Sequence, residues 1–243
     1  IRRGWNERPD GNYTVTDPNP FEQYVRDQGY EYKTGYALPG FRDKLGAVPS
    51  DLPDDCHIDA YVGMKSLEYL NTVSGEEPFF LWTGFYGPHH PYVPSGRFAH
   101  MYDPNSLPSF HRDPDDIDRK PPEYALYFEA KDHKYRGFAD ASDQTFKEMK
   151  AAYYGMVSQI DWQVGLLLDR LQESGHAENT VVVFLSDHGE FLGDHGIPAK
   201  APFLLDCELH VPCLIRAPGI KSGDRQALVE SIDSLCHQRC HAG

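Results

Sequence analysis

Two stretches of the chain repeat the order of a helix followed by a strand. Between Ile58 and Leu70, apolar residues recur at near-helical spacing, and Ser74-Gly75 then interrupts the pattern. The next stretch, residues 78–85 (Pro-Phe-Phe-Leu-Trp-Thr-Gly-Phe), is an apolar run typical of a buried strand. The first stretch therefore predicts a helix, a turn and a buried strand.

The second stretch shows the clearest periodicity in the chain. Apolar residues recur every three or four positions at Met149, Tyr153, Met156, Ile160, Val164, Leu167 and Leu171. This spacing predicts a long amphipathic helix, which Gly175 can end in a left-handed cap. Residues 180–186 (Thr-Val-Val-Val-Phe-Leu-Ser) follow as a β-branched run without alternation, which is typical of a strand covered on both faces.

Helices and buried strands in this order predict an α/β fold with a mostly parallel central sheet flanked by helices. Residues 211–216 are expected to add a shorter strand, with Pro212 placing its start at an edge. Residues 1–50 are expected to be loop apart from a short helix over 20–28, and residues 88–143 a long surface excursion.

Charge narrows the function classes. The chain has 243 residues and a formal net charge of -14, which disfavours binding to nucleic acid and docking on anionic membranes through basic residues. Its longest apolar stretches, such as 181–185, are far shorter than the ~20 residues of a membrane-spanning helix. Any anionic ligand must therefore be met by local positive charge.

Polar residues follow both predicted strands. The first strand leads into Pro88-His89-His90-Pro91, and the second leads into Asp187-His188-Gly189-Glu190. In open α/β sheets the carboxyl ends of strands share one crevice, so we expect these groups to converge there. The alternative is that they are ordinary turn residues, since Asp, Gly, Pro and His all suit turns.

Asp187 and His188 offer a carboxylate oxygen and an imidazole nitrogen from adjacent positions, which suits a divalent metal. A metal would also solve the charge problem of an acidic protein that binds an anion. Lys200 is the single lysine between Lys150 and Lys221, and on its own it is best interpreted as a solvated surface charge.

The segment 185–196 (Leu-Ser-Asp-His-Gly-Glu-Phe-Leu-Gly-Asp-His-Gly), with Lys200 just beyond it, resembles the C-terminal signature of the sulfatases, within the alkaline phosphatase superfamily. Residues 88–91, 153–161 and 211–219 resemble the same family in the same order. The resemblance covers the chain from about residue 20 to residue 233.

The resemblance implies roles for individual residues. Asp187 and His188 match the family's second pair of metal ligands, with calcium as the usual metal and magnesium or manganese as alternatives. Lys200 matches the lysine that contacts the sulfate and leaving-group oxygens. His89 matches the histidine that contacts the sulfate and aids proton transfer, in preference to His90, because the family pattern is Pro-His-x-Pro.

The chain also departs from the family. It lacks the Cys-x-Pro-x-Arg or Ser-x-Pro-x-Arg motif whose first residue becomes formylglycine, the nucleophile, and it lacks the early Asp-Asp metal pair. The expectation is therefore a partial catalytic domain over 1–233, with formylglycine in an absent N-terminal part. Residues 234–243 form an atypical tail in which Cys236 and Cys240 fit no common metal-site spacing well.

The sequence thus predicts a metal-dependent sulfuric ester hydrolase that acts on a sulfated small molecule or carbohydrate and is inactive as this fragment. The alternatives are a phosphonate or phosphate ester hydrolase of the same superfamily and a non-catalytic glycan-binding or vestigial protein. The oligomeric state stays open. The cysteines leave the compartment undecided, and a periplasmic, secreted or lysosomal-type compartment is favoured over the cytoplasm.

Overall fold

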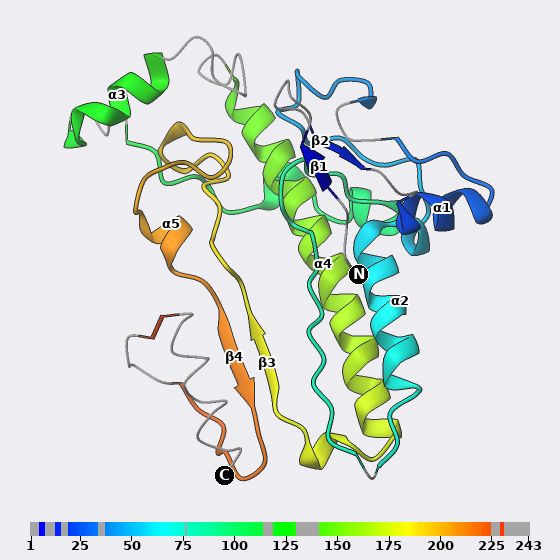
Figure 1. Ribbon diagram of the computed structural model, residues 1–243. Coiled ribbons are helices and arrows are strands. Elements are labelled where there is room, and N and C mark those ends of the chain that lie inside the picture. Colours follow the sequence, from blue (N-terminus) through cyan, green and yellow to red (C-terminus); the bar gives the residue numbers. More distant parts are fainter. Residues whose placement is uncertain are drawn as a thin grey trace.

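A computed structural model describes residues 5–7, 13–15, 19–33, 37–75, 77–113, 119–129, 141–224 and 229–230 (Figure 1). The helices are α1 (Pro20–Asp27), α2 (Ile58–Leu70), α3 (Pro122–Glu129), α4 (Asp143–Glu173) and α5 (Asp206–Leu209). The strands are β1 (Trp5–Glu7), β2 (Tyr13–Val15), β3 (Val182–Leu185) and β4 (Cys213–Arg216). Short 3-10 helices include η2 (Asp54–Cys56), η3 (Gly96–His100), η4 (Pro104–Ser106), η7 (Ala177–Asn179) and η8 (Asp194–Gly196). None of the described helices has both the length and the apolar character of a membrane span.

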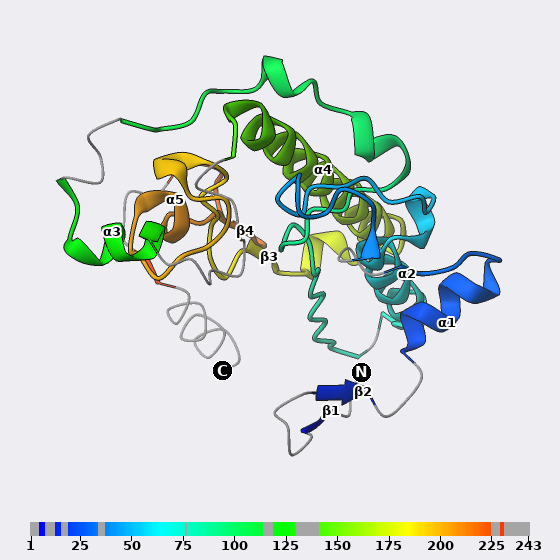
Figure 2. The same cartoon turned by 90° about the horizontal axis from the view of Figure 1, so that it is seen from above.

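The helices α2 and α4 lie side by side and form the backbone of the structure (Figures 1 and 2). Helix α4 begins where the Ser142 hydroxyl accepts a hydrogen bond from the Thr145 amide, and Gly175 adopts a positive φ just beyond its end. Both helices and the cap at Gly175 confirm the predictions from periodicity. The short helix predicted over residues 20–28 is confirmed as α1, which begins after the cap residue Asn19.

The core consists of three clusters of buried side chains. The largest joins the start of α4, through Phe146, Met149 and Met156, to Tyr92 and Leu192. A second cluster packs α1 against α2, and a third packs α3 against the loop 191–197. The first and third clusters include residues from the loops that follow the two predicted strands, so core packing holds these loops in place.

The excursion between residues 88 and 143 is more structured than predicted. It contains η3, η4 and α3, and its green segment arches over the start of α4 toward α3 (Figure 2). Helix α3 is tied down by Tyr124, which is buried and stacks on Phe203 with ring centroids 3.7 Å apart. The expected tail 234–243, including Cys236 and Cys240, lies outside the described residues.

The predicted mostly parallel sheet is not confirmed in the part of the chain that the structure describes. Strand β3 pairs antiparallel with β4, with Val183 opposite Ile215 and Phe184 opposite Leu214. Parallel pairing among the described residues is limited to isolated bridges, Ala47 with Tyr92 and Ser50 with Ser95. Strands β1 and β2 form a separate antiparallel pair.

The predicted buried strand over residues 79–85 is extended but belongs to no strand. Alternate side chains face α2: the Thr83 hydroxyl donates to Ser66 Oγ at 3.0 Å, and the Phe79 ring contacts Tyr69. The other side chains face outward, so that Phe80 is 69% and Trp82 73% exposed. The prediction of burial was wrong here because, among the described residues, no strand covers the outer side of this segment.

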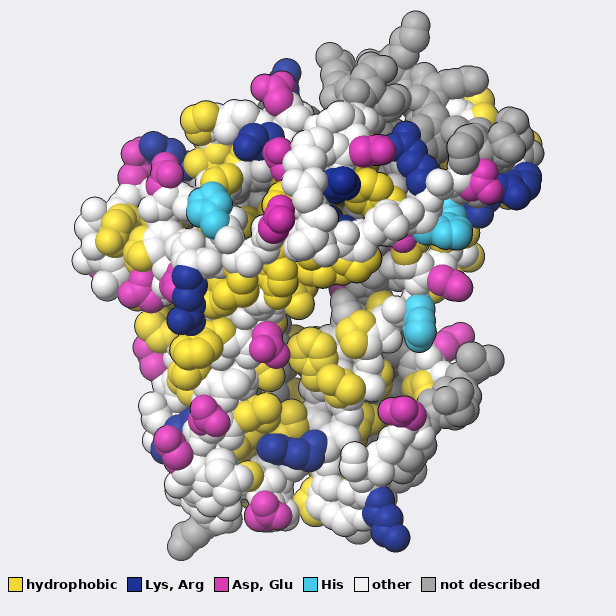
Figure 3. All heavy atoms as spheres, turned by 180° about the vertical axis from the view of Figure 1, so that it is seen from behind, with side chains coloured by type: hydrophobic (Ala, Val, Ile, Leu, Met, Phe, Trp, Pro, Cys, Tyr) yellow, Lys and Arg dark blue, Asp and Glu magenta, His cyan; other side chains and the backbone are white. Residues whose placement is uncertain are grey.

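The pair β3–β4 is likewise exposed on both faces. Neighbouring residues of a strand point to opposite faces, so Val183 with Ile215 and Phe184 with Leu214 place one apolar pair on each face. All four side chains are exposed, which contradicts the prediction of a covered strand. In the view from behind, hydrophobic side chains gather across the middle of the molecule and around a hollow (Figure 3).

Candidate anion-binding site

The two segments predicted to carry the site run in the same direction. Residues 79–85 run back along α2, and β3 runs back from the end of α4 in the same direction, so both deliver their following loops to the same end of the molecule (Figure 1). His89 follows the first segment and His188 follows the second. The prediction that these polar residues converge is confirmed for His89 and His188, although no parallel sheet joins the two segments within the described residues.

Lys200 lies between the two histidines. Its Nζ atom is 2.9 Å from His89 Nε2 and 3.3 Å from His188 Nε2. Lys200 is exposed, and both imidazole rings are partly buried, so the three side chains form a cluster that is open to solvent on one side. The structure thus brings together three of the four predicted site residues around one ammonium group.

The hydrogen-bond partners of each imidazole show which ring nitrogen carries the proton and which presents a lone pair to Lys200. His89 Nδ1 lies 2.5 Å from the His90 carbonyl oxygen, and His188 Nδ1 lies 2.7 Å from the Gly189 carbonyl oxygen. A carbonyl oxygen only accepts, so each Nδ1 carries the proton and each Nε2 is an acceptor for the Lys200 ammonium. The arrangement places a fixed cation and two oriented imidazoles at one spot.

Asp187, the fourth predicted residue, stands at the rim. Its side chain is 87% exposed, Oδ1 accepts the His188 amide at 3.0 Å, and Oδ2 lies 3.7 Å from His188 Nε2. Two ligands of one divalent cation lie up to about 5 Å apart, so this carboxylate oxygen and imidazole nitrogen are close enough to share such an ion; of the two, the carboxylate oxygen is the kind of ligand that calcium prefers. Among the described residues, no group of three or more His, Cys, Asp or Glu side chains is placed to hold a metal.

Two partly buried carboxyl groups, those of Glu190 and Glu208, lie near the cluster. Burial raises the pKa of Glu190 to about 7, while His188 and Lys200 lower it by less. Burial also raises the pKa of Glu208, again against weaker opposition from the same two residues. Glu208 was missed from the sequence, because its place behind Lys200 depends on α5 folding back onto the loop that follows β3.

The remaining residues of the two motifs are structural. His90 is buried, and its Nε2 lies 3.2 Å from the Leu45 carbonyl oxygen, so it faces the core and not Lys200. Asp194 accepts the His111 amide, and the His195 amide donates to the His111 carbonyl. These contacts tie the loop after β3 to the segment that arches over α4.

The family model described as Sulfatase matches residues 3–237. The chain belongs to the sulfatase family. The match spans nearly the whole sequence, including His89, Asp187, His188 and Lys200, and it places the chain in the alkaline phosphatase superfamily.

Curated relatives agree with the family. The chain is 31% identical over 193 residues to the multifunctional alkaline phosphatase superfamily protein PehA of Trinickia caryophylli, which covers 76% of this chain and 36% of that protein. It is 31% identical over 172 residues to an arylsulfatase of Clostridium perfringens, covering 65% of this chain and 33% of that enzyme. The chain thus spans about a third of the length of these relatives.

A solved structure supports the fold. The phosphonate monoester hydrolase SpPMH from Silicibacter pomeroyi superimposes with a TM-score of 0.69 at 25% identity, covering 83% of this chain and 42% of that one. The chain therefore shares its fold with sulfatases and phosphonate hydrolases.

Proposed function

We propose that this chain carries the sulfate-binding part of a metal-dependent sulfuric ester hydrolase that acts on a sulfated small molecule or carbohydrate. The observation that carries the proposal is the contact of Lys200 with both His89 and His188 at the end of two adjacent segments. A sulfate monoester is a compact anion, and this cluster places the Lys200 ammonium between two oriented imidazoles on a chain whose net charge is -14.

Each residue has a distinct task in this proposal. Lys200 binds a non-bridging or leaving-group oxygen through its ammonium protons and offsets the charge that develops there. The His89 ring is held by the bond to the His90 carbonyl, so its Nε2 is directed at the same spot; once that nitrogen has taken up a proton, it can donate the proton to the leaving oxygen. Asp187 and His188 would hold the divalent metal, which supplies Lewis-acid polarisation of the sulfate oxygens.

A metal ion and the Lys200 ammonium would compete for the Nε2 atom of His188. The His188 Nε2 lone pair faces Lys200, so ligation of a metal by that atom requires the ammonium group to move away. Calcium is the expected metal, with magnesium or manganese as alternatives. The nucleophile motif is absent from the sequence, so we expect purified residues 1–243 to hydrolyse aryl sulfates poorly or not at all.

A titration with inorganic sulfate tests the proposal directly. Sulfate added to the 15N-labelled chain is expected to shift the imidazole signals of His89 and His188 with one saturating curve, whereas chloride at matched ionic strength is not. Signals that respond equally to both salts would contradict specific anion binding. Robust turnover of a chromogenic aryl sulfate by this chain would overturn the expected inactivity.

A second candidate function is hydrolysis of phosphonate or phosphate esters. Its support is the similarity to SpPMH, whose name states a phosphonate monoester substrate. Inorganic sulfate is a full dianion at neutral pH, whereas phosphate and methylphosphonate are mixtures of mono- and dianion that keep a P–OH donor. A site that prefers phosphorus should therefore bind phosphate or methylphosphonate more tightly than sulfate in spite of their smaller charge. The same titration with these anions separates the two candidates.

A non-catalytic glycan-binding role is the third alternative. It predicts binding of a sulfated glycan that is unchanged by Asp187→Ala, because a metal would have no part in it. The hydrolase proposal predicts that the same substitution weakens calcium-dependent binding. The expected periplasmic, secreted or lysosomal-type compartment stays a prediction.

A further inference from the structure

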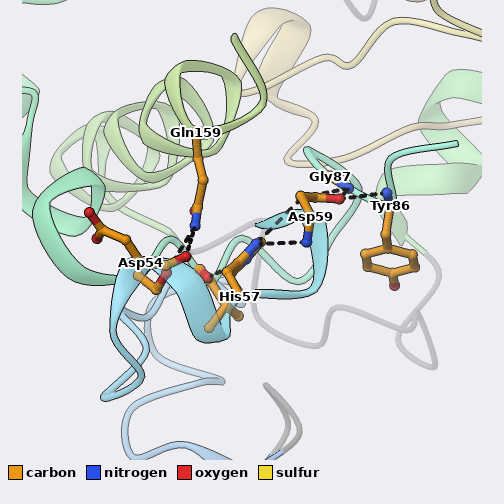
Figure 4. A network of polar contacts seen from close by, with 8 residues as sticks. Asp54, His57, Asp59, Tyr86, Gly87 and Gln159 are labelled. Atoms are coloured by element: carbon orange, nitrogen blue, oxygen red, sulfur yellow. Dashed lines mark hydrogen bonds and ion pairs between the residues drawn. The ribbon is translucent and has the colours of Figure 1, made fainter. Parts of the chain in front are cut away.

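Residues 86–93, here called the histidine loop, carry His89 to Lys200. The segment that leads into the loop has no strand partner in the described part of the chain, so a sheet does not set its position there. The second half of the loop is held by Tyr92, which bonds to Gly46 and Val48 through its main chain, and by His90, which contacts the Leu45 carbonyl. Two further contacts come from the beginning of α2, and one of them holds the start of the loop (Figure 4).

The first contact is made by the side chain of Asp59, the second residue of α2, which is 0% exposed. Its Oδ1 accepts the Tyr86 amide at 2.7 Å and the Gly87 amide at 3.1 Å, and its Oδ2 lies 3.1 Å from the same Gly87 nitrogen. One carboxylate therefore binds two consecutive main-chain amides at the beginning of the histidine loop.

The second contact is made by His57, which precedes α2. Its Nδ1 accepts the Asp59 amide at 3.2 Å, so Nε2 carries the proton and donates to the Val93 carbonyl at 3.2 Å. Burial lowers the pKa of His57 more than the nearby Asp59 raises it. The ring is therefore neutral, and the far end of the histidine loop is held by a neutral hydrogen bond.

A neutral His57 leaves the Asp59 carboxylate without a cationic partner among these contacts. A buried carboxylate of this kind depends on N–H donors, and charge-assisted hydrogen bonds are about twice as strong as neutral ones. The beginning of α2 adds a favourable dipole. The fit is also close: a Cβ added at Gly87 would lie 2.4 Å from Asp59 Oδ2 and 3.2 Å from both Ile160 and Met156.

We infer that Asp59 is a positioning residue whose carboxylate, by binding the Tyr86 and Gly87 amides, sets the histidine loop so that His89 meets Lys200. The inference rests on the proposed role of His89 in anion binding. The structural path from Asp59 to His89 is short, because the His89 amide donates to the Tyr86 carbonyl at 3.3 Å within the same turn whose amides Asp59 binds.

The test observes the His89 ring in the whole chain without any ligand. In the wild type, 15N NMR should show one tautomer for His89, with the proton on Nδ1 and Nε2 as an acceptor. Asp59→Asn keeps the shape but loses the charge and one acceptor, and it should give a mixture of tautomers. Asp59→Ala should give a larger loss of the single tautomer.

Asp54→Asn is the matched control. Asp54 also accepts a main-chain amide, that of Arg97 at 2.8 Å, and it lies just before α2, but its partner is beyond the histidine loop. This variant should keep the wild-type His89 signals. If Asp59 only stabilised the fold, its folded variants would show wild-type signals too, and that result would overturn the inference.

Gly87→Ala covers the case in which Asp59→Ala does not fold. The added methyl group pushes on the carboxylate from the loop side and leaves Asp59 itself in place. It should displace His89 in the same way, and unchanged His89 signals in folded Gly87→Ala and Asp59→Asn would again contradict the inference. Failure of the proposed function is a separate result: sulfate would then leave His89 unshifted in the wild type.

Discussion

Lys200 Nζ lies 2.9 Å from His89 Nε2, although 111 positions separate the two residues in the sequence. The contact joins the histidine loop to the loop after β3. Because each residue sits on a loop held by other contacts, a change at either side chain should alter anion binding without unfolding the chain.

Replacing Lys200 with alanine tests its share of the binding energy. Hydrogen bonds to a charged group contribute about 1.5–3 kcal/mol, so Lys200→Ala should weaken sulfate binding by about tenfold or more. Isothermal titration calorimetry at fixed ionic strength measures the change. Lys65→Ala removes an equal charge from α2, where Lys65 pairs with Glu68, and it should leave sulfate affinity unchanged.

Asp187 should govern calcium binding. Asp187→Asn removes the carboxylate charge but keeps the size, and we expect calcium affinity to fall by about tenfold or more, since calcium prefers charged oxygen ligands. Calcium should also shift the 15N signal of His188 Nε2, as Lys200 gives way to the metal. Asp161→Asn, on the exposed side of α4, is the control. Equal calcium affinity in both variants would exclude Asp187 as a ligand.

His57 should make the fold sensitive to mild acid. Burial lowers its pKa in the folded state below the ordinary value of 6.5, so below that value the unfolded chain binds a proton that the folded chain does not. The free energy of unfolding should therefore fall as pH falls from about 6.5, and this contribution should be absent above it. Urea denaturation at several pH values between 7.5 and 5.5 measures the slope.

The variant His57→Asn isolates this contribution. Asparagine still caps α2 but does not titrate, so the variant should be less stable at pH 7.5 yet lose less stability on acidification. His100→Asn alters an exposed histidine and should keep the wild-type slope. Parallel pH profiles for wild type and His57→Asn would show that another group causes the acid sensitivity.

Two glycines should respond to alanine with opposite signs. Gly46 has a φ of 79°, and an added Cβ would lie 2.0 Å from His90 Nε2, so Gly46→Ala should lower the free energy of unfolding by at least about 1–3 kcal/mol. Gly165 lies within α4 with nothing within 4 Å of an added Cβ. Gly165→Ala should raise the free energy of unfolding by about 0.5–1 kcal/mol. Thermal or urea unfolding of both variants checks the pair.

The sequence predicted best those elements whose packing partners are among the described residues. Helices α2 and α4 were predicted because each shows apolar residues at helical spacing, and the two pack on each other. The extended segment at Phe80 and Trp82 and the strand β3 show the patterns of covered strands, but the described residues provide no cover. The composition of a segment predicts whether its side chains are suited to burial, but it does not predict which residues will cover them.

The candidate site was also predictable in part. The position of polar residues after two predicted strands indicated that His89 and His188 converge, whereas Lys200 was expected beside them only from the resemblance to the sulfatases. The support from Asp59 was not predictable, because an acidic residue in the first turn of a helix is adequately explained by the helix dipole alone. Only the folded chain shows that its carboxylate binds amides 27 and 28 positions away.

The exposed pair β3–β4 has a consequence for how the site keeps its shape. A ribbon with apolar side chains on both faces gains nothing from one alignment over another, so burial alone does not fix its alignment. A slip of two residues would carry Asp187 and His188 about 7 Å along the ribbon. Such a slip is opposed by the amides of Gly189 and Glu190, which donate to the carbonyls of Glu208 and Cys207 in α5, just before β4. These two main-chain bonds therefore set the alignment of the ribbon, and with it the height at which His188 meets Lys200.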